Sequence, residues 1–553
     1  MFNIVCYTEE LSADIQSFFR KVFRENKRVV DFSNKDIDII NLSNEYMNEG
    51  CFWCAIDDNK KIVGTIALRP KENFYELRRF FVLKKYHNKG IGQKLLNSLI
   101  DFCMIKKIYI IKAATMEDGT SIHHILTKNG FKLTKRYSNS TADIFYKLKI
   151  DSMYIYHYEL TKLKESFLHS LILNPTENIP MYKKEYRTDF FEGLYVSDRF
   201  KDVNDRVIFA GRNDYIRFFE TIKEEWKTRL KAYDVDLKTL SGLNAHLVLF
   251  LCIVKNSNIV MLLPEECGGH FATTKILESF NVNVIHMIPD NNNKSVNVEK
   301  TIELIEEKHP NFIFVDRSEG LVYEDFSWLK KYNDIYKIFD ASQYLVQILT
   351  GHYVNPFDMG FDMIVSTLHK NYPGPQKGII AVKERSDIWN DYLLNAKTYI
   401  SNTHPMAIAK SLMPLLSSRE FIEYSELTIE CVKKLEELLL NNNLPVIKRD
   451  TANPSTLHIW ILCNTKEESY KYYLKLEQLH ILTNYRLLPY NLGYGLRIGM
   501  SAAVRMGLRP CHIKELAAIM TEAYYDEISN KLIKKAEKLI NKIIITGELS
   551  DKL

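Results

Sequence analysis

Two short stretches decide the fold and the chemistry of this chain: FDASQ at residues 339–343 and STLHKNYPGPQKG at residues 366–378. Asp340 comes directly after a largely apolar run, and Lys370 follows a second such run. Apolar runs of this length, bounded by polar residues, are typical of buried strands. A carboxylate at the end of a buried strand is costly to bury unless a cation meets it.

The aspartate and the lysine together predict a site for pyridoxal 5'-phosphate (PLP). A protonated pyridine nitrogen is a cation that a buried Asp340 can meet. A lysine such as Lys370 forms a Schiff base with an aldehyde when its surroundings lower its pKa. PLP carries both groups. Spacing alone leaves an alternative, in which Asp340 belongs to an ordinary ion pair and Lys370 lies on the surface.

Strand and helix patterns alternate on both sides of these stretches. Such alternation predicts an α/β domain with a mostly parallel sheet covered by helices on both faces. Ligands of such sheets bind at the carboxyl ends of the strands. A helical pattern occurs at Val298–Lys308, and beyond residue 400 a further α+β unit ends in an amphipathic helical stretch, Leu516–Asn541. The apolar runs are Leu247–Val254, Ile259–Leu263, Val282–Met287, Phe312–Val315, Ile335–Phe339 and Met363–Ser366.

Composition and charge exclude several classes of protein. The chain has 553 residues, of which 46% are hydrophobic and 26% charged, so intrinsic disorder is excluded. The net charge of +5 is small, and we expect no binding to nucleic acid through bulk charge. The most apolar run, Leu247–Val254, is too short for a membrane helix and suits a buried strand or helix segment. Nine cysteines and no signal-peptide pattern favour a reducing cytoplasm, and we expect no metal site.

A change of pattern near residue 150 predicts the first domain boundary. Before it, strand patterns at Ile62–Arg69, Leu77–Val82 and Tyr109–Ala113 and a helical pattern at Gly92–Phe102 indicate a compact α+β domain. The predicted domains are residues 1–150, residues 151–400 and residues 401–553.

The stretch FFVLKKYHNKGIGQKLL, residues 80–96, is typical of a strand, a glycine loop and the start of a helix. Gly90 and Gly92 allow the backbone to approach an anion, and the helix behind them offers free N–H groups and the positive end of its dipole. A pyrophosphate fits this arrangement. Two glycines at a helix start are more often only a turn, so spacing alone leaves both interpretations open.

Residues 76–96, together with TKNGF at residues 127–131, resemble the GNAT acetyltransferase family. The resemblance covers residues 1–150 and implies acetyl-CoA as the cofactor, although His87 stands where the family has Gln or Arg. Val82 would lie on the strand that pairs with the pantetheine arm. The pyrophosphate would lie on the backbone amides of Lys89, Gly90, Ile91, Gly92, Gln93 and Lys94.

Catalysis by this domain depends on two positions. Many members of the family carry a tyrosine general acid where this chain has Leu126. His123, His124 or a water could replace it, although paired histidines on a helix are more often solvated at the surface. Glu76 occupies the place of a base for the attacking amine, with an ion pair to Arg78 or Arg79 as the alternative. We therefore predict either an N-acetyltransferase that uses Glu76 or a module that only binds acetyl-CoA.

Residues 165–530 resemble the fold-type I PLP enzymes, and among them the serine hydroxymethyltransferase group. The resemblance is carried by separate motifs that occur in the family's order. They are NPTEN at 174–178, FEG at 191–193, SGLNA at 241–245, GGH at 268–270, the two stretches quoted above, and GLRIG at 495–499.

The resemblance implies a role for each matching residue. Lys370 would form the Schiff base, Asp340 would face the pyridine nitrogen, and His270 would stack on the ring. Glu192 would be the general acid/base on the substrate hydroxyl, and Arg497 would clamp the substrate carboxylate. The remaining expected contacts are Thr176 with the substrate carboxylate and Ser241, Gly242, Leu243, Gln343 and His369 with the cofactor.

Several positions depart from the family pattern. Gln343 replaces a histidine, Phe190 replaces a tyrosine, Leu243 replaces a phosphate-binding serine, and Ile208–Gly211 replaces a Tyr-Tyr-Gly-Gly element. The segment between Asn484 and the motif arginine is shorter than in the family. Because that segment helps to hold folate, the resemblance does not extend to tetrahydrofolate use.

The predicted reaction is of the aldol type at Cα of a small amino acid. PLP stabilises a carbanion at Cα, and the protein selects the bond that breaks by orienting it. Arg497 on the carboxylate and Glu192 near a β-hydroxyl favour Cα–Cβ chemistry, with glycine and an aldehyde or with a β-hydroxy amino acid. Gln343 and Phe190 leave transamination, racemisation and decarboxylation open. The fusion suggests acetylation within one pathway, and the family resemblance implies a homodimer.

Overall fold

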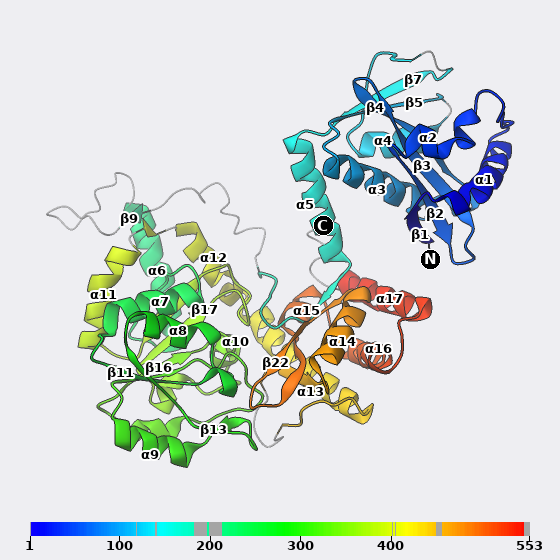
Figure 1. The fold of residues 1–553 in the computed structure, drawn as a ribbon. Coiled ribbons are helices and arrows are strands. Elements are labelled where there is room, and N and C mark those ends of the chain that lie inside the picture. Colours follow the sequence, from blue (N-terminus) through cyan, green and yellow to red (C-terminus); the bar gives the residue numbers. More distant parts are fainter. Residues whose placement is uncertain are drawn as a thin grey trace. The chain divides into compact units, whose positions relative to one another are not determined.

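The computed structural model describes residues 2–117, 119–138, 141–181, 196–197, 213–400, 402–403, 405–449 and 456–546. The chain forms two compact units, Met1–Phe167 and Leu168–Leu553 (Figure 1). The division lies later than the change of pattern near residue 150, because helix α5 (Ser152–Leu168) packs Tyr154 and Tyr158 against the first unit's core. A further boundary at residue 400 stays a prediction.

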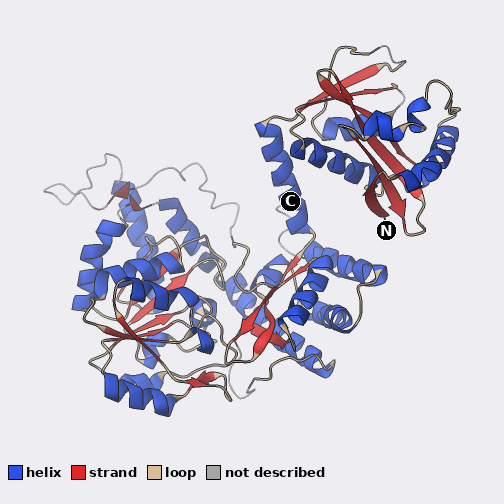
Figure 2. Ribbon diagram, viewed as in Figure 1, coloured by secondary structure: helices blue, strands red, loops and turns tan. Residues whose placement is uncertain are grey.

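The first unit is built on a seven-stranded sheet with the order β1-β2-β3-β4-β5-β7-β6 (Figure 2). Neighbouring residues Cys51 and Phe52 belong to different cores because side chains alternate between the two faces of a strand. Helices α1 and α2 cover one face, and α3 and α4 cover the other. The elements are β1 (Phe2–Cys6), α1 (Ser12–Glu25), α2 (Leu42–Tyr46), β2 (Cys51–Asp57), β3 (Ile62–Lys71), β4 (Phe74–Val82), α3 (Ile91–Ile105), β5 (Ile110–Thr115), α4 (Thr120–Lys128), β6 (Lys132–Leu133) and β7 (Ile144–Lys149).

Strands β4 and β5 are parallel neighbours that pair over a short distance only. Tyr75–Leu77 pairs with Ile111–Ala113, and beyond Leu77 strand β4 pairs with β3 alone. A bulge in β4 falls at Arg79, whose φ of 50° is left-handed, and Arg79 is buried in ion pairs with two aspartates. The end of β4 therefore has one backbone edge without a strand partner.

The second unit contains a seven-stranded sheet with the order β10-β18-β17-β16-β15-β11-β12. Strands β17, β16, β15, β11 and β12 run parallel, and β18 is antiparallel to β17, which confirms the mostly parallel sheet. The run Leu247–Val254, open between strand and helix, lies almost entirely in helix α7. The elements are α6 (Asn213–Leu230), β10 (Asp234–Asp236), α7 (Gly242–Ile253), β11 (Ile259–Leu262), α8 (Phe271–Ser279), β12 (Asn283–His286), α9 (Val298–Lys308), β15 (Phe312–Val315), β16 (Tyr336–Asp340), α10 (Leu345–Thr350), β17 (Met363–Thr367), β18 (Gly378–Val382) and α11 (Asp387–Tyr399).

The C-terminal part of this unit combines a three-stranded sheet, β20-β23-β22, with helices, as expected for α+β structure. The stretch Leu516–Asn541 is two helices rather than one, because Asp526 adopts an extended backbone and ends α16. The larger elements are α12 (Pro405–Leu416), α13 (Ser418–Asn441), β20 (His458–Leu462), α14 (Lys466–Gln478), β22 (Asn484–Leu488), β23 (Gly493–Gly499), α15 (Ser501–Met506), α16 (Ile513–Tyr525) and α17 (Asn530–Thr546). Two-residue strands form the pairs β8 (Leu171–Ile172) with β21 (Ile481–Leu482), β9 (Val196–Ser197) with β19 (Asn402–Thr403), and β13 (Pro289–Asp290) with β14 (Ser295–Val296). In the part of the chain that the structure describes, no helix combines the length and the apolar character needed to cross a membrane.

Candidate active site

Strands β16 and β17 pair in parallel and bring Asp340 to the carboxyl edge of the large sheet. The buried carboxylate accepts two hydrogen bonds, from His246 Nε2 at 2.9 Å and from the Ser342 backbone N–H at 2.7 Å. Burial raises the pKa of Asp340, but the bonds from His246 and Ser342 outweigh it and hold the pKa at about 2. Asp340 is therefore ionised, as a partner of a pyridinium must be.

Lys370 follows β17 and is half-buried. Burial lowers the pKa of Lys370, Asp340 opposes this change, and Arg497 adds to it. Asn178 fixes the backbone here, since its Nδ2 donates to the carbonyls of Lys370 at 2.6 Å and Asn371 at 3.1 Å. An amine with a lowered pKa is the form that attacks an aldehyde.

His270 is the N-cap residue of α8, and its Nδ1 accepts from the Ala272 N–H at 3.3 Å. Its ring meets His246 edge to face, with centroids 5.9 Å apart. Burial lowers the pKa of His270 to about 4, and His246 acts in the same direction, so His270 is neutral at neutral pH. Sequence reasoning missed His246, although it lies one helical turn after Gly242 on the same face of α7.

The start of α7 forms the predicted phosphate cup. Ser241 caps the helix, with its Oγ accepting from the Asn244 N–H at 3.1 Å, and the first-turn amides of Gly242 and Leu243 have no intrahelical acceptor. A Cβ at Gly242 would lie 3.2 Å from Thr367 Cβ, so glycine allows α7 to approach β17 closely. His369, the other expected contact, bonds Thr367 Oγ1 at 2.8 Å through its Nδ1.

Arg497 lies on β23 opposite Asn484 of β22 and is 2% exposed. Its Nη1 lies 3.4 Å from Glu319 Oε1, and burial lowers the pKa of Arg497 to about 10 while Glu319 opposes this. Thr176 Oγ1 donates to Asn174 Oδ1 at 2.9 Å, and the same oxygen accepts from Asn484 Nδ2 at 3.2 Å. Arg497 and Thr176, the two residues expected to bind the substrate carboxylate, are thus both connected to the strand pair β22–β23.

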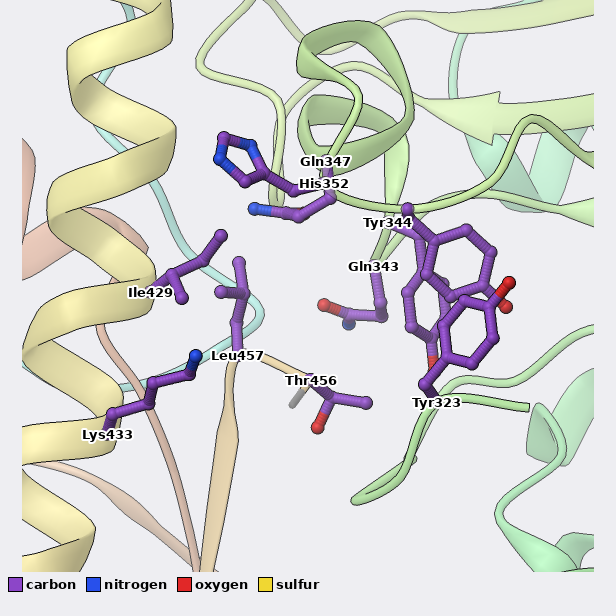
Figure 3. A pocket seen from close by; sticks show the side chains of 10 residues that line it. Tyr323, Gln343, Tyr344, Gln347, His352, Ile429, Lys433, Thr456 and Leu457 are labelled. Atoms are coloured by element: carbon purple, nitrogen blue, oxygen red, sulfur yellow. The ribbon is translucent and has the colours of Figure 1, made fainter. Parts of the chain in front are cut away.

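Gln343 is buried, and its amide lines a cavity of about 100 Å³ between α10 and α13 (Figure 3). No described residue accepts a hydrogen bond from Gln343 Nε2. Gln347, one turn further on, lines the same cavity and has no partner for either amide atom among the described residues. Contact of Gln343 with a cofactor oxygen stays a prediction. The predicted acid/base Glu192 and the departures at Phe190 and Ile208–Gly211 lie outside the described residues.

In the first unit, α3 begins after Gly90, which has a left-handed φ of 76° and open space around an added Cβ. The first-turn amides of residues 91–93 have no intrahelical acceptor, but the Lys94 N–H donates to Gly90 O at 3.1 Å. The Lys94 amide is therefore already bonded, unlike the other amides expected to meet the pyrophosphate. Lys89 lies exposed before the helix. Val82 ends β4 on the edge that β5 does not cover.

Glu76 is buried and ion-paired. Its Oε2 lies 3.0 Å from Arg69 Nη2 and 3.5 Å from Arg78 Nη1. The ion pair with Arg78 was one of the two alternatives that the sequence left open. The role of Glu76 as a base for the attacking amine stays a prediction.

Leu126 is fully buried in the core beside α4, so its position offers no proton donor. His123, one turn earlier, bonds the Tyr146 hydroxyl at 2.9 Å and Met116 O at 3.0 Å. His123 is therefore held by the fold and is not one of a pair of solvated histidines.

Comparisons with known proteins match each unit to a family. Residues 208–520, more than half of the chain, match the family model described as serine hydroxymethyltransferase. The chain belongs to the serine hydroxymethyltransferase family. Residues 13–131 match the model of the acetyltransferase (GNAT) family.

Among curated relatives, the serine hydroxymethyltransferase of Pyrobaculum calidifontis is 26% identical over 320 residues, 56% of this chain and 74% of that protein. That of Sulfolobus acidocaldarius is 24% identical over 394 residues, 68% of this chain and 88% of that protein. The crystal structure of L-threonine transaldolase from Pseudomonas fluorescens in the internal aldimine state has a TM-score of 0.65 at 18% identity. It covers 70% of this chain and 91% of that one, and it shows the fold alone.

PLP is the cofactor of the serine hydroxymethyltransferase family, and acetyl-CoA that of GNAT domains. The described residues fit PLP: an ionised carboxylate at Asp340, a lysine of lowered pKa at 370, and a helix start at Ser241 with free amides. The open space at Gly90 likewise fits a pyrophosphate.

Proposed function

We propose that the second unit catalyses PLP-dependent aldol-type chemistry at Cα of glycine or a β-hydroxy amino acid. The observation that carries the proposal is the buried Asp340 and the half-buried Lys370 at one sheet edge, with Arg497 close enough to influence the pKa of Lys370. Asp340 suits the ring nitrogen of PLP, Lys370 suits its aldehyde, and Arg497 suits the substrate carboxylate.

When bound, PLP supplies an electron sink for a carbanion at Cα. Asp340, which stays ionised because its own pKa is low, would keep the ring nitrogen protonated, and His270 would face the ring as a neutral imidazole. Arg497 would bind the substrate carboxylate and so orient the bond that breaks. Glu192, by resemblance, moves the proton of the β-hydroxyl.

Product analysis tests this proposal. The full-length chain loaded with PLP is incubated with labelled glycine and a panel of aldehydes, or with L-threonine, and products are identified by mass spectrometry. We expect β-hydroxy amino acids in the first case and release of an aldehyde in the second, both lost in Lys370→Ala. Formation of a keto acid without any aldehyde would instead establish transamination.

We propose that the first unit binds acetyl-CoA and acetylates the amine of an amino acid. The free amides at the start of α3 and the uncovered edge of β4 support the binding step. A second candidate, binding without transfer, is favoured by the buried Leu126 and by the ion-paired Glu76.

Calorimetric titration with acetyl-CoA, run beside an acetylation assay with the products of the second unit, separates these candidates. A rate of acetyl transfer that is lower in Glu76→Gln, at unchanged affinity for acetyl-CoA, supports catalysis by the first unit. Binding without any transfer supports the second candidate, and no binding refutes both. Homodimer formation and a cytoplasmic location stay predictions.

A further inference from the structure

A buried carboxylate lies beside the arginine that we assign to the substrate. Glu319 follows β15 and is 3% exposed, and its Oε1 pairs with Arg486 Nη1 as well as with Arg497 Nη1. Arg486 lies two residues after Asn484, the cross-strand neighbour of Arg497, so both arginines project from the same face of β22 and β23. The sequence patterns gave no indication of Glu319 or Arg486.

This pairing engages Nη1 of the Arg497 guanidinium and leaves Nε without a partner. Nη1 faces Glu319 and donates to Ser318 O at 3.5 Å. Nε is buried and has no partner among the described residues. A buried N–H donor without a partner is costly, and a carboxylate is an acceptor that satisfies it.

The charges of the three side chains do not cancel. Burial raises the pKa of Glu319, and Glu265 acts in the same direction, although both guanidinium groups oppose this. We count the carboxylate as ionised because its Oε1 lies within ion-pair distance of both arginines. Two guanidinium groups and one carboxylate then leave a net charge of +1. One substrate carboxylate neutralises it. A second carboxylate would be buried without a partner, which is strongly unfavourable.

We propose that Glu319 restricts the substrate of the PLP site to amino acids with a single carboxylate. It acts as a positioning residue, because it cancels one guanidinium charge and holds Arg497 by Nη1, while Nε keeps no partner among the described residues. The inference rests on the proposed function of the second unit and adds the class of amino acid that it accepts.

Calorimetric titration of L-threonine and L-aspartate into the full-length chain loaded with PLP tests the proposal. We expect the wild type to prefer threonine. Glu319→Gln keeps the shape of the side chain but raises the net charge of the cluster to +2, and should shift the affinity ratio toward aspartate by roughly tenfold. Glu319→Gln combined with Arg486→Gln restores the charge and should restore the preference for threonine.

Arg486→Gln alone is a second, independent test of the same charge argument. This variant brings the net charge of the cluster to zero and should weaken threonine binding by roughly tenfold. Thermal unfolding of each variant shows whether it folds. An unchanged ratio in Glu319→Gln, or a double variant that keeps the altered ratio, overturns the inference and leaves the proposed function in place. If neither amino acid binds to the PLP-loaded wild type, the proposed function fails and this inference fails with it.

Discussion

Single side chains at the PLP site are held in definite ionisation states by their neighbours. Asp340 stays ionised because two hydrogen bonds outweigh burial, and His270 stays neutral because burial is not offset. Lys370 loses part of its basicity for the same reason. Desolvation acts on all three, and the local donors decide which group keeps its charge.

The low pKa of His270 predicts how stability depends on pH. The unfolded chain protonates this imidazole below about pH 6.5, and the folded chain does so only near 4. The free energy of unfolding therefore decreases as the pH falls through this window. In His270→Asn, this decrease between about pH 7 and about pH 4.5 should be smaller by about 2 kcal/mol. Urea unfolding of the second unit at both pH values measures it, and equal decreases would contradict the assignment.

Gln347 is buried with an amide that no described residue bonds. Burying an unpaired amide is unfavourable. Replacing Gln347 with Leu should therefore raise the free energy of unfolding by about 1 kcal/mol, as measured by urea unfolding. Gln347→Ala is the control, because it removes the amide but enlarges the cavity and should not stabilise. A destabilised Leu variant would mean that the amide is paired through water.

At the scale of elements, both candidate sites use the start of a helix. α7 begins at Gly242 behind the cap Ser241, and α3 begins at Ile91 behind Gly90. A helix start offers N–H groups without intrahelical acceptors and the positive end of a dipole, which suits a phosphate. At both helix starts the backbone amides are the groups expected to bind the phosphate.

Ser241 both caps α7 and lies at the proposed phosphate cup. Ser241→Ala should lower the free energy of unfolding by about 1 kcal/mol and also weaken PLP binding. Ser386 caps α11 in the same way, accepting from the Trp389 N–H at 3.1 Å. Ser386→Ala is the matched control, with the same loss of stability and unchanged PLP affinity. Equal PLP affinity in both variants, measured by titration, would remove Ser241 from the site.

Gly90 has a left-handed φ and an open environment. Gly90→Ala introduces about 1 kcal/mol of backbone strain and places a methyl group where the anion approaches, so acetyl-CoA affinity should fall about tenfold. Gly351 has a φ of 78° and similarly open space, but it ends α10 in the second unit. Gly351→Ala should bring similar strain without any change in acetyl-CoA affinity. Calorimetric titration of both variants decides the matter.

At the scale of the whole molecule, the two units have separate hydrophobic cores. In the first unit, one core packs against α3 and the other against α1. In the second unit, the cores lie on the two faces of the large sheet. Separate cores allow each unit to unfold cooperatively by itself.

Scanning calorimetry of the full-length chain should therefore show two transitions. Acetyl-CoA at about 100 times its Kd should stabilise only the first unit, by about 2.7 kcal/mol, and PLP only the second. Each ligand should thus raise one melting temperature by a few degrees and leave the other unchanged. A single transition that both ligands raise would contradict independent folding.

Local sequence pattern predicted much of the fold. The helical period at Val298–Lys308 gave the bounds of α9, and the apolar runs before Asp340 and Lys370 gave β16 and β17. The run Leu247–Val254 stayed ambiguous, because a short and fully apolar segment satisfies both the period of a strand and the period of a helix. The break between α16 and α17 was missed, because no glycine or proline marks it.

The sequence by itself determined the two families and the sheet type, and it predicted Asp340, Lys370 and Arg497 as charged residues of the PLP site, because apolar period and motif order are properties of neighbouring residues. Only the tertiary structure decided the partners of those charges. His246 bonds Asp340 across 94 residues of sequence, and Glu319 pairs with Arg497 from the loop after β15. Ion pairs depend on the approach of remote segments within a few ångströms, and no local pattern encodes that distance.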